Sequence, residues 1–168
     1  MVRRRRVYLS LGSNLGRREA NIRQALAALA GEGVQVIRVS SRYRTEPVGY
    51  TAQPWFLNCA AEVTTDLMPL QLLHCCQAIE RHLGRRRVIL QGPRSIDIDI
   101  VLYENLVVHA PGLTIPHPRL AERRFVLIPL AEIAPDAEHP VLRQCVSEML
   151  QETRDRSQVV RLKPESES

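Results

Sequence analysis

The sequence predicts an α+β fold of the ferredoxin-like type, a mainly antiparallel sheet with helices packed on one face. The main observation is the order of hydrophobic patterns along the chain, which is strand, helix, strand, strand, helix, strand. The second observation is composition: 168 residues, 45% hydrophobic and 24% charged, are typical of one globular domain with a single core. An extra hairpin and extra helices are expected after this unit, in the C-terminal part.

The first half of the chain contains both helices and three strands of the unit. Alternation of period two predicts the strands, and apolar residues every three or four positions predict the helices, each ended by a glycine. The expected elements are a strand over Val7–Leu11, a turn at GSNLG, a helix over Arg18–Ala30, strands over Val34–Tyr43 and Phe56–Thr65, and a helix over Pro69–Leu83. The expected buried faces are Ile22, Ala25, Leu26 and Leu29 in the first helix and Leu72, Cys76, Ile79 and Leu83 in the second.

The second half opens with an alternating strand in the run GPRSIDIDIVL, residues 92–102. The alternation places Ile96, Ile98, Ile100 and Leu102 on one face, and Asp97, Asp99 and Val101 on the other. The later expected elements are a hairpin from Ile98–Tyr103 through Glu104 and Asn105 into Leu106–Val108, a helical segment over Glu122–Ile133 interrupted by Pro129, and a helix over Val141–Leu150. We expect three segments in all: a basic extension over residues 1–6, one domain over residues 7–155 and a loose tail over residues 156–168.

The net charge of +5 makes an RNA-binding module of ferredoxin-like fold one hypothesis. Aromatic residues, on which such modules stack bases, make up only 4% of the chain, so we expect no nucleic-acid partner. Apolar stretches are too short for a membrane span, and no signal-peptide pattern follows the N-terminal arginines. Four cysteines without metal or disulfide spacing suit buried thiols in a reducing compartment, so a cytoplasmic location without membrane attachment is expected.

The pair Asp97 and Asp99 is the strongest chemical feature of the sequence. One strand repeat separates them by roughly 7 Å, and at an effective dielectric constant of 20 their repulsion costs about 2 kcal/mol. A divalent cation relieves it, because Mg²⁺ is commonly held by one or two carboxylates with phosphates and water. Arg94, behind the turn-forming Gly-Pro, can supply a fixed cation for the same phosphates. An exposed strand face paired with an arginine is the alternative interpretation.

Gly-Pro-Arg followed by Asp-Ile-Asp resembles the signature of the 6-hydroxymethyl-7,8-dihydropterin pyrophosphokinases of folate biosynthesis. Further segments resemble that family in the same order, and the resemblance covers about residues 7–140. They are YLSLGSNLG, SSRYRTEPVG, QPWFLNCA and LTIPHPRLAERRFVLIPLAEIAP, followed by the late His139-Pro140. The resemblance implies the ferredoxin-like architecture and transfer of a diphosphate from ATP, as co-substrate, to the hydroxymethyl group of the pterin, with two Mg²⁺ ions held by Asp97 and Asp99.

Residues near the pterin include Phe56 and Asn58, which share a face of a predicted strand because one residue separates them. An aromatic ring and an amide suit a flat heterocycle with donors and acceptors on its edge. Judged without the family, Phe56 is more simply a core residue. The resemblance implies that both bind pterin, and it adds Phe125 as the opposite ring and Thr45 and Val48 from the loop after the second strand.

The nucleotide side is assigned by resemblance alone. Gln77 and Glu80 lie off the apolar stripe of the second helix, and His117 is held between two prolines. The residues matching ATP contacts are Gln77, Glu80, Arg85, Arg87, Arg94, Ile98, Thr114, His117 and Arg123. The predicted catalytic set is Arg85, Arg94, Asp97 and Asp99. GSNLG lacks the complete spacing of a phosphate loop and is interpreted as a turn, with Gly12 near the pocket.

Residues 84–91, GRRRVILQ, are expected to form a lid over the phosphates, since phosphoryl transfer needs charge neutralisation and exclusion of water. A solvated charged face is the alternative. The chain departs from the common family pattern at Leu90 and Gln91, where many members have Arg-Trp, and at Gly112, where some have an arginine. A metal-dependent phosphohydrolase is a third functional hypothesis beside the kinase and the RNA-binding module. We expect a monomer with small-molecule substrates.

Overall fold

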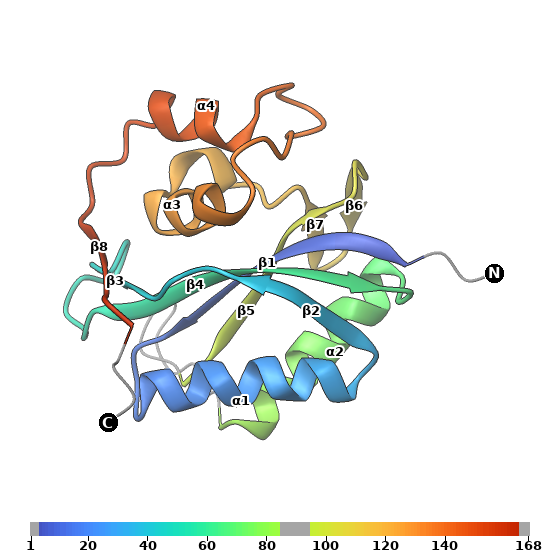
Figure 1. Cartoon of the computed structure of the whole chain (residues 1–168), viewed down its shortest axis with the longest axis horizontal. Helices are drawn as coiled ribbons and strands as arrows, with labels where there is room; N and C mark the ends of the chain where they lie inside the picture. Colours follow the sequence, from blue (N-terminus) through green and yellow to red (C-terminus); the bar gives the residue numbers. More distant parts are fainter. Residues whose placement is uncertain (1–3, 85–94, 165–168) are drawn as a thin grey trace.

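In the computed structural model, which describes residues 4–84 and 95–164, a six-stranded antiparallel sheet lies between two layers of helices (Figure 1). The strand order is β5-β1-β4-β3-β8, and β2 pairs with β4 on the same side as β3. The helices are α1 (Arg18–Gly31), α2 (Pro69–His82), α3 (Arg124–Ile133), α4 (Val146–Glu152) and a short 3-10 turn over Leu120–Glu122. The strands are β1 (Arg5–Ser13), β2 (Val34–Val39), β3 (Tyr43–Thr45), β4 (Phe56–Thr65), β5 (Asp97–Tyr103), β6 (Val108–Ala110), β7 (Leu113–Ile115) and β8 (Val159–Arg161). The predicted fold class is confirmed.

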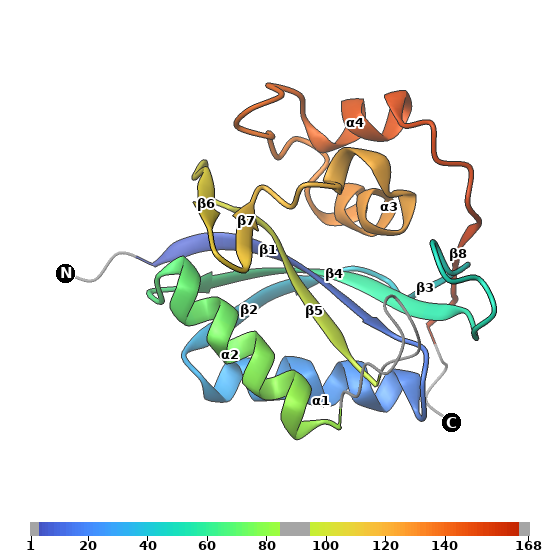
Figure 2. The same cartoon turned by 180° about the vertical axis from the view of Figure 1, so that it is seen from behind.

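Each face of the sheet has its own hydrophobic core. The core beneath α1 and α2 includes the predicted helix faces, with Ile22, Leu29 and Leu72 fully buried. The second core lies between the sheet and α3 and α4, and it includes Leu127 and Leu130. Figure 2 shows the two helical layers from behind. The prediction of helices on one face is therefore wrong in one respect, because the C-terminal helices cover the other face.

A β-bulge in β5 changes the predicted alternation. Tyr8 pairs with Leu102 but the next residue of β1, Leu9, pairs with Ile100, so Val101 is the extra residue. Leu102 consequently packs into the core beneath α3, together with Val101, instead of joining Ile98 and Ile100 on the opposite face. The alternation predicted for Ile96, Ile98 and Ile100 is confirmed, since all three lie in the core with α1 and α2.

The predicted strand Val34–Tyr43 is two strands, β2 and β3, separated at residues 40–42. Ser40 causes the break, because its hydroxyl Oγ accepts a hydrogen bond from the backbone N–H of Ala60 at 2.9 Å. Its own N–H donates to the Ala60 carbonyl at 2.8 Å. A side chain thus replaces part of the backbone ladder, which is the usual competition between serine and sheet hydrogen bonding.

The added hairpin joins β6 to β7, and not β5 to the following segment as predicted. The chain does turn after Tyr103, where Glu104 has φ 48°. The tight turn lies at Pro111-Gly112, where Gly112 has φ 78°. Proline followed by a glycine of positive φ is the pattern of a type II turn, so the sequence contained the signal for this hairpin.

The C-terminal helices differ from prediction in their limits. Helix α3 begins at Arg124 and continues through Pro129 to Ile133, so the predicted interruption is wrong. Helix α4 begins at Val146 and not at Val141, because Glu148 Oε1 accepts the Cys145 N–H at 3.0 Å and caps the helix there. His139 Nδ1 accepts the N–H groups of Val141 and Leu142 at 3.2 and 3.1 Å, which holds the preceding segment in a turn.

Both ends of the described chain are more ordered than predicted. Strand β1 starts at Arg5, inside the expected basic extension, and Arg4 donates to the Thr64 carbonyl at 3.1 Å. Strand β8 lies inside the expected loose tail and pairs with β3. All four cysteines are free thiols; Cys59 and Cys76 are buried as predicted, whereas Cys75 and Cys145 are only partly buried. Among the described helices, none combines the length and the hydrophobicity that crossing a bilayer requires.

Candidate active site

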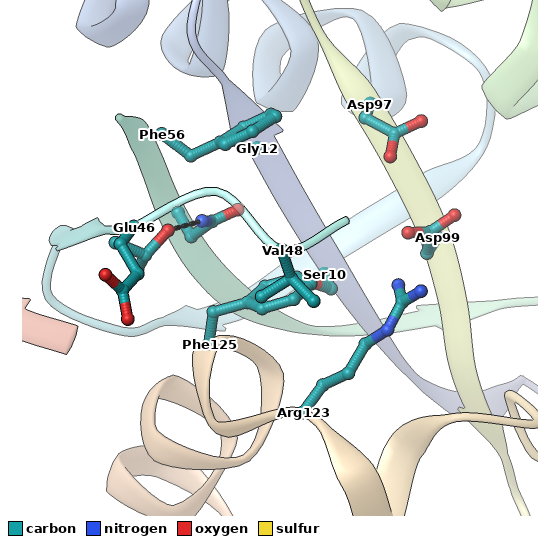
Figure 3. Close-up of a pocket in the computed structure, with 11 residues that line it drawn as sticks. Ser10, Gly12, Glu46, Val48, Phe56, Asp97, Asp99, Arg123 and Phe125 are labelled. Atoms are coloured by element: carbon teal, nitrogen blue, oxygen red, sulfur yellow. Dashed lines mark hydrogen bonds between the residues drawn. The ribbon is translucent and has the colours of Figure 1, made fainter. Parts of the chain in front are cut away.

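A pocket opens on the sheet face that α3 covers, at the end of α3 where the helix begins (Figure 3). Its space is about 540 Å³ including the part open to solvent. The residues that line it are Ser10, Gly12, Thr45, Glu46, Val48, Phe56, Asn58, Asp97, Asp99, Arg123 and Phe125. They come from five segments far apart in the sequence, and the sheet register brings them together.

The five residues predicted for the pterin all line this pocket. Phe56 on β4 and Phe125 on α3 lie on opposite sides of it (Figure 3). These are the only two phenylalanines in the chain, so both serve the pocket. A planar ring entering between them can contact an aromatic face on each side.

An amide lies at the base of the pocket. Asn58 is 4% exposed, and its Nδ2 donates to Thr45 Oγ1 at 2.6 Å. Thr45 ends strand β3 and acts here through its side chain, whereas the sequence placed it in a loop. The bond fixes the plane of the amide while leaving hydrogen-bonding positions for a ligand.

Gly12 makes room for this amide. Strand β1 lies between β5 and β4, and Gly12 pairs with Asp97 on one side and Asn58 on the other. A Cβ atom at position 12 would overlap Asn58 Oδ1 and contact the Phe56 ring at 3.6 Å. The glycine predicted to lie near the pocket therefore lines it, and its role is the close approach of a side chain.

Asp97 and Asp99 both line the pocket, on the side opposite Glu46 (Figure 3). Their shared face, predicted from strand alternation, is confirmed by the pairing of Asp97 with Gly12 and Asp99 with Ser10. The backbone between them is held from the other face of the sheet. There the Ile98 N–H donates to Glu80 Oε2 at 2.8 Å.

Glu80 was expected to lie off the buried face of α2, but this expectation is wrong, because the residue is only 4% exposed. Its carboxylate secures the edge of β5 between the two aspartates. Gln77, predicted with it, is exposed on α2 and does not line either of the two pockets found in the described part of the chain.

Arg123 was predicted to contact ATP, and its guanidinium extends into the first pocket beside Phe125 and toward Asp99 (Figure 3). Its Cζ lies 5.5 Å from the centre of the Phe125 ring. Burial and the positive charge of Arg119 lower the pKa of Arg123, while the charges of Asp99 and Asp97 raise it. Arg123 thus contributes positive charge facing the carboxylate pair.

A second pocket lies on the other side of Asp99. It is lined by apolar residues together with Asp99, Thr114 and His117, which come from α2, β5, the β6–β7 hairpin and the segment after it. The lining residues are Leu73, Ile98, Asp99, Ile100, Ala110, Gly112, Leu113, Thr114, His117 and Pro118. Ile98, Thr114 and His117, three of the residues predicted for ATP, therefore lie together, and Asp99 borders both pockets.

His117 is held at the edge of the second pocket by its backbone and its ring. Its N–H donates to the Val101 carbonyl at 3.0 Å, and its Nδ1 accepts the Arg119 N–H at 3.2 Å. Burial, together with the charge of Arg123, lowers the pKa of His117 to about 4, although Asp97 acts in the opposite direction. The neutral ring with Nδ1 as acceptor carries its proton on Nε2, where it can donate to a phosphate oxygen.

Ser10 and Glu46 also line the pocket and were not predicted from the sequence. Ser10 could have been found from period two, because it lies on β1 between Tyr8 and Gly12, opposite the apolar face. Asn14 was also missed. Its Nδ2 donates to Gln53 Oε1 at 2.8 Å and to the Pro54 carbonyl at 2.9 Å, which holds the loop before Phe56.

Arg85, Arg87 and Arg94, together with Leu90, Gln91 and the proposed lid, lie outside the described residues.

The carboxylates of the described residues bear on the predicted metal site. No group of three or more histidine, cysteine or acidic side chains suited to a metal occurs among residues 4–84 and 95–164. Two carboxylates on one pocket wall do fit Mg²⁺, which takes the rest of its ligands from phosphates and water.

Comparison with known families agrees with this geometry. Residues 8–135 match the model of the 7,8-dihydro-6-hydroxymethylpterin-pyrophosphokinase (HPPK) family. The chain belongs to the HPPK family. The match includes every described residue predicted for pterin, ATP or metal, and it ends before α4 and β8.

Relatives of known name fall into two groups by length. The chain is 49% identical over 132 residues to the 2-amino-4-hydroxy-6-hydroxymethyldihydropteridine pyrophosphokinase of Bacillus subtilis, covering 78% of this chain and 79% of that protein. It is 49% identical over 144 residues to the folic acid synthesis protein fol1 of Schizosaccharomyces pombe, covering 85% of this chain but 20% of that protein. This HPPK chain thus spans about a fifth of the fungal relative.

The fold resembles solved HPPK structures at low sequence identity. Wild-type HPPK-DHPS of Plasmodium falciparum superimposes with a TM-score of 0.70 and 16% identity, over 89% of this chain and 44% of that one. The likeness supports the architecture of the HPPK domain, including helices on both faces of the sheet.

Replacing Gly12 by alanine should displace the Asn58 amide, because the added Cβ overlaps its Oδ1. We expect a loss of about 1 to 3 kcal/mol in the free energy of unfolding from overpacking. Calorimetry should show that binding of 6-hydroxymethylpterin weakens much more than binding of an ATP analogue. Gly31→Ala is the matched control, because a Cβ there meets nothing within 4 Å. Equal effects of the two substitutions on pterin binding would contradict this role of Gly12.

His117 should make stability depend on pH. Its pKa of about 4 in the folded protein lies below the ordinary value of 6.5. The unfolded chain therefore binds the proton more readily, and stability falls as pH decreases from about 6.5 to 4. Between pH 7.5 and 4.5 the wild type should lose about 2 to 3 kcal/mol more than His117→Gln in urea unfolding. His109→Gln, on exposed β6, is the control and should follow the wild type. Parallel curves for all three proteins would refute the shift.

Proposed function

We propose that the protein transfers a diphosphate group from ATP to the hydroxymethyl group of 6-hydroxymethyl-7,8-dihydropterin, giving AMP and the pterin diphosphate for folate biosynthesis. Membership of the HPPK family supports this reaction. The B. subtilis and Methylorubrum extorquens relatives carry the name of this enzyme and have 49% identity to the chain over 132 residues each.

The observation that carries the proposal is the position of Asp99 between two pockets. One pocket has two phenylalanines and an amide, which suit a planar heterocycle with polar edges. The other combines apolar side chains with Thr114 and His117, which suits a nucleotide base with its phosphates directed toward the aspartates. A group passing from nucleotide to pterin must cross the boundary where Asp97 and Asp99 lie.

Each side chain has a defined part in this reaction. Phe56 and Phe125 stack on the pterin, and Asn58 orients it through its edge. His117 donates from Nε2 to a phosphate oxygen, and Arg123 adds positive charge near the carboxylates. Asp97 and Asp99 hold Mg²⁺, of which we propose two ions, and when bound these supply charge neutralisation and alignment of the transferred phosphates. Arg85, Arg87 and Arg94 are proposed to meet the same phosphates.

The other two functional hypotheses receive no support from the relatives. An RNA-binding module or a phosphohydrolase would not require an aromatic pocket adjoining a nucleotide-sized one. A monomer located in the cytoplasm and acting on small molecules remains our proposal for the state of the protein.

Phosphorus NMR of the protein with ATP, Mg²⁺ and the reduced pterin tests the function. The expected result is conversion of ATP to AMP with new resonances of a pterin diphosphate, dependent on the pterin and abolished by a chelator of Mg²⁺. Production of ADP or inorganic phosphate without modified pterin would reject the proposal.

Alanine at Asp97 or Asp99 should separate folding from activity. Each substitution removes one of two like charges and leaves the strand intact, so stability should change little. Turnover should fall by about two to four orders of magnitude, because a metal ligand is lost. Asp66→Ala, at an exposed position after β4, is the control and should retain full activity. Near-normal turnover of either pocket variant at millimolar Mg²⁺ would remove the metal assignment.

Removing one aromatic ring should weaken pterin binding selectively. Phe56→Ala and Phe125→Ala should each cost roughly 1 to 3 kcal/mol in binding of 6-hydroxymethylpterin, the scale of stacking on a planar base. Phe125→Leu keeps most of the volume and should still lose much of the affinity. Calorimetry with the pterin and with an ATP analogue distinguishes the sites, and equal losses for both ligands would indicate unfolding instead of lost stacking.

A further inference from the structure

The C-terminal strap, residues 153–162, lies outside the part of the chain matched by the HPPK family. It leaves the end of α4, descends along the edge of the molecule and ends as β8 beside β3 (Figure 1). The layer of α3 and α4 is thereby connected to the sheet. The strap contacts both of the walls that enclose the candidate pterin pocket.

Asp155 contacts the wall formed by α3. Its Oδ2 accepts the N–H of Arg124 at 2.9 Å, and its Oδ1 accepts the N–H of Ser157 at 2.9 Å. Arg124 is the first residue of α3 and stands between Arg123 and Phe125, which both line the pocket. Asp155 therefore binds the backbone that carries these two side chains.

The start of α3 depends on this acceptor. The N-cap residue Arg123 makes no capping hydrogen bond through its side chain. The first N–H groups of a helix have no partner within the helix, and a carboxylate there also interacts favourably with the helix dipole. Burial opposes ionisation of Asp155, but hydrogen bonds from Ser157 and Arg124 outweigh it and lower the pKa of this carboxyl.

The strap contacts the opposite wall three residues later. Gln158 N–H donates to Glu46 Oε1 at 3.0 Å, and the Gln158 carbonyl accepts the Glu46 N–H at 3.1 Å. Val159 then pairs with Thr45, the residue whose hydroxyl holds Asn58. Both Glu46 and Thr45 line the pocket.

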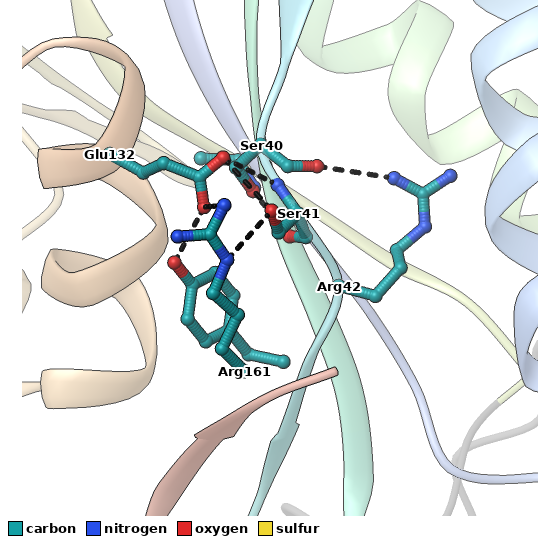
Figure 4. Close-up of polar contacts among 7 residues, drawn as sticks. Ser40, Ser41, Arg42, Glu132 and Arg161 are labelled. Atoms are coloured by element: carbon teal, nitrogen blue, oxygen red, sulfur yellow. Dashed lines mark hydrogen bonds and ion pairs between the residues drawn. The ribbon is translucent and has the colours of Figure 1, made fainter. Parts of the chain in front are cut away.

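A third contact closes the arrangement around Glu132 near the end of α3 (Figure 4). Glu132 accepts hydrogen bonds from the Ser41 N–H at 2.8 Å and from the Tyr43 hydroxyl at 2.6 Å. Arg161 of β8 donates to Ser41 Oγ at 3.1 Å and lies 4.0 Å from the Glu132 carboxylate. The far end of α3 is thus joined to β3 by the network that includes the strap.

We propose that Asp155 is a positioning residue for the pterin pocket, which sets the distance of Arg123 and Phe125 from the Asn58 wall through the Arg124 backbone. The inference rests on the proposed function, because it assigns the pocket to the pterin. The strap as a whole acts as a brace between α3 and β3. Asp155 itself does not line the pocket, so its effect on the ligand is transmitted through the start of α3.

Asp155→Asn tests the inference, because an amide keeps one acceptor and loses the other. The matched control is Asp136→Asn, the same chemical change at an exposed position after α3. Binding of 6-hydroxymethylpterin to Asp155→Asn should weaken by about fivefold to twentyfold, less than the full effect of losing a hydrogen bond to a charged group, because Asp155 acts on the ligand only through the start of α3. Affinity for an ATP analogue should stay within about twofold, and KM for the pterin should rise more than kcat falls.

Hydrogen exchange of the wild-type chain gives a second test, which does not depend on the folding of a variant. If the brace supports pterin binding, bound pterin must stabilise the brace. Hydrogen exchange of the Arg124 and Gln158 amides should therefore slow when 6-hydroxymethylpterin binds, while exchange at the start of α4 stays unchanged.

The outcomes separate the two proposals. In one outcome the wild type makes pterin diphosphate while Asp155→Asn binds pterin as tightly as Asp136→Asn does. This result overturns the role of Asp155 and leaves the proposed function standing. Unchanged exchange of both amides in the pterin complex overturns it as well. Wild-type protein that binds no pterin overturns both. Equal loss of pterin and ATP-analogue binding in Asp155→Asn indicates a general structural role and also rejects the inference.

Discussion

The close approach of three strands at Gly12 is the constraint on which the site depends. The strand that carries Gly12 separates Asp97 from Asn58, so the carboxylates of β5 and the amide of β4 lie on either side of a single residue. A side chain there would fill the space that the Asn58 amide occupies. The sheet thus provides the base of the pocket as well as its charge and its hydrogen-bonding groups.

Helices on both faces make this arrangement possible. The core beneath α1 and α2 supports one face of the sheet, and Glu80 extends from that layer to accept a hydrogen bond from β5. The layer of α3 and α4 covers only part of the other face, so polar residues at its margin remain accessible to a ligand. The bulge at Val101 turns an additional side chain toward α3, which secures that layer close to the carboxylates.

Electrostatics within the site are balanced by nearby groups from separate segments. Asp97 and Asp99 repel each other, and Arg123 from the start of α3 offsets part of that repulsion. The same arginine, together with burial, keeps His117 neutral, so the ring donates one hydrogen bond without adding another charge. Phosphates and cations would enter a site in which one arginine already faces two carboxylates.

The sequence by itself determined the elements whose signal is local: the alternation that puts Asp97 and Asp99 on one face, the apolar stripes of α1 and α2, and the shared face of Phe56 and Asn58. Period two and period 3.6 need no knowledge of distant residues. The motifs also sufficed for the family, since it depends on residue types at fixed spacing. Tertiary structure decided the rest, because distant partners made the choice. The break at Ser40 depends on Ala60, whose N–H donates to the Ser40 hydroxyl. Asp155 and strand β8 take their positions from partners in α3 and β3.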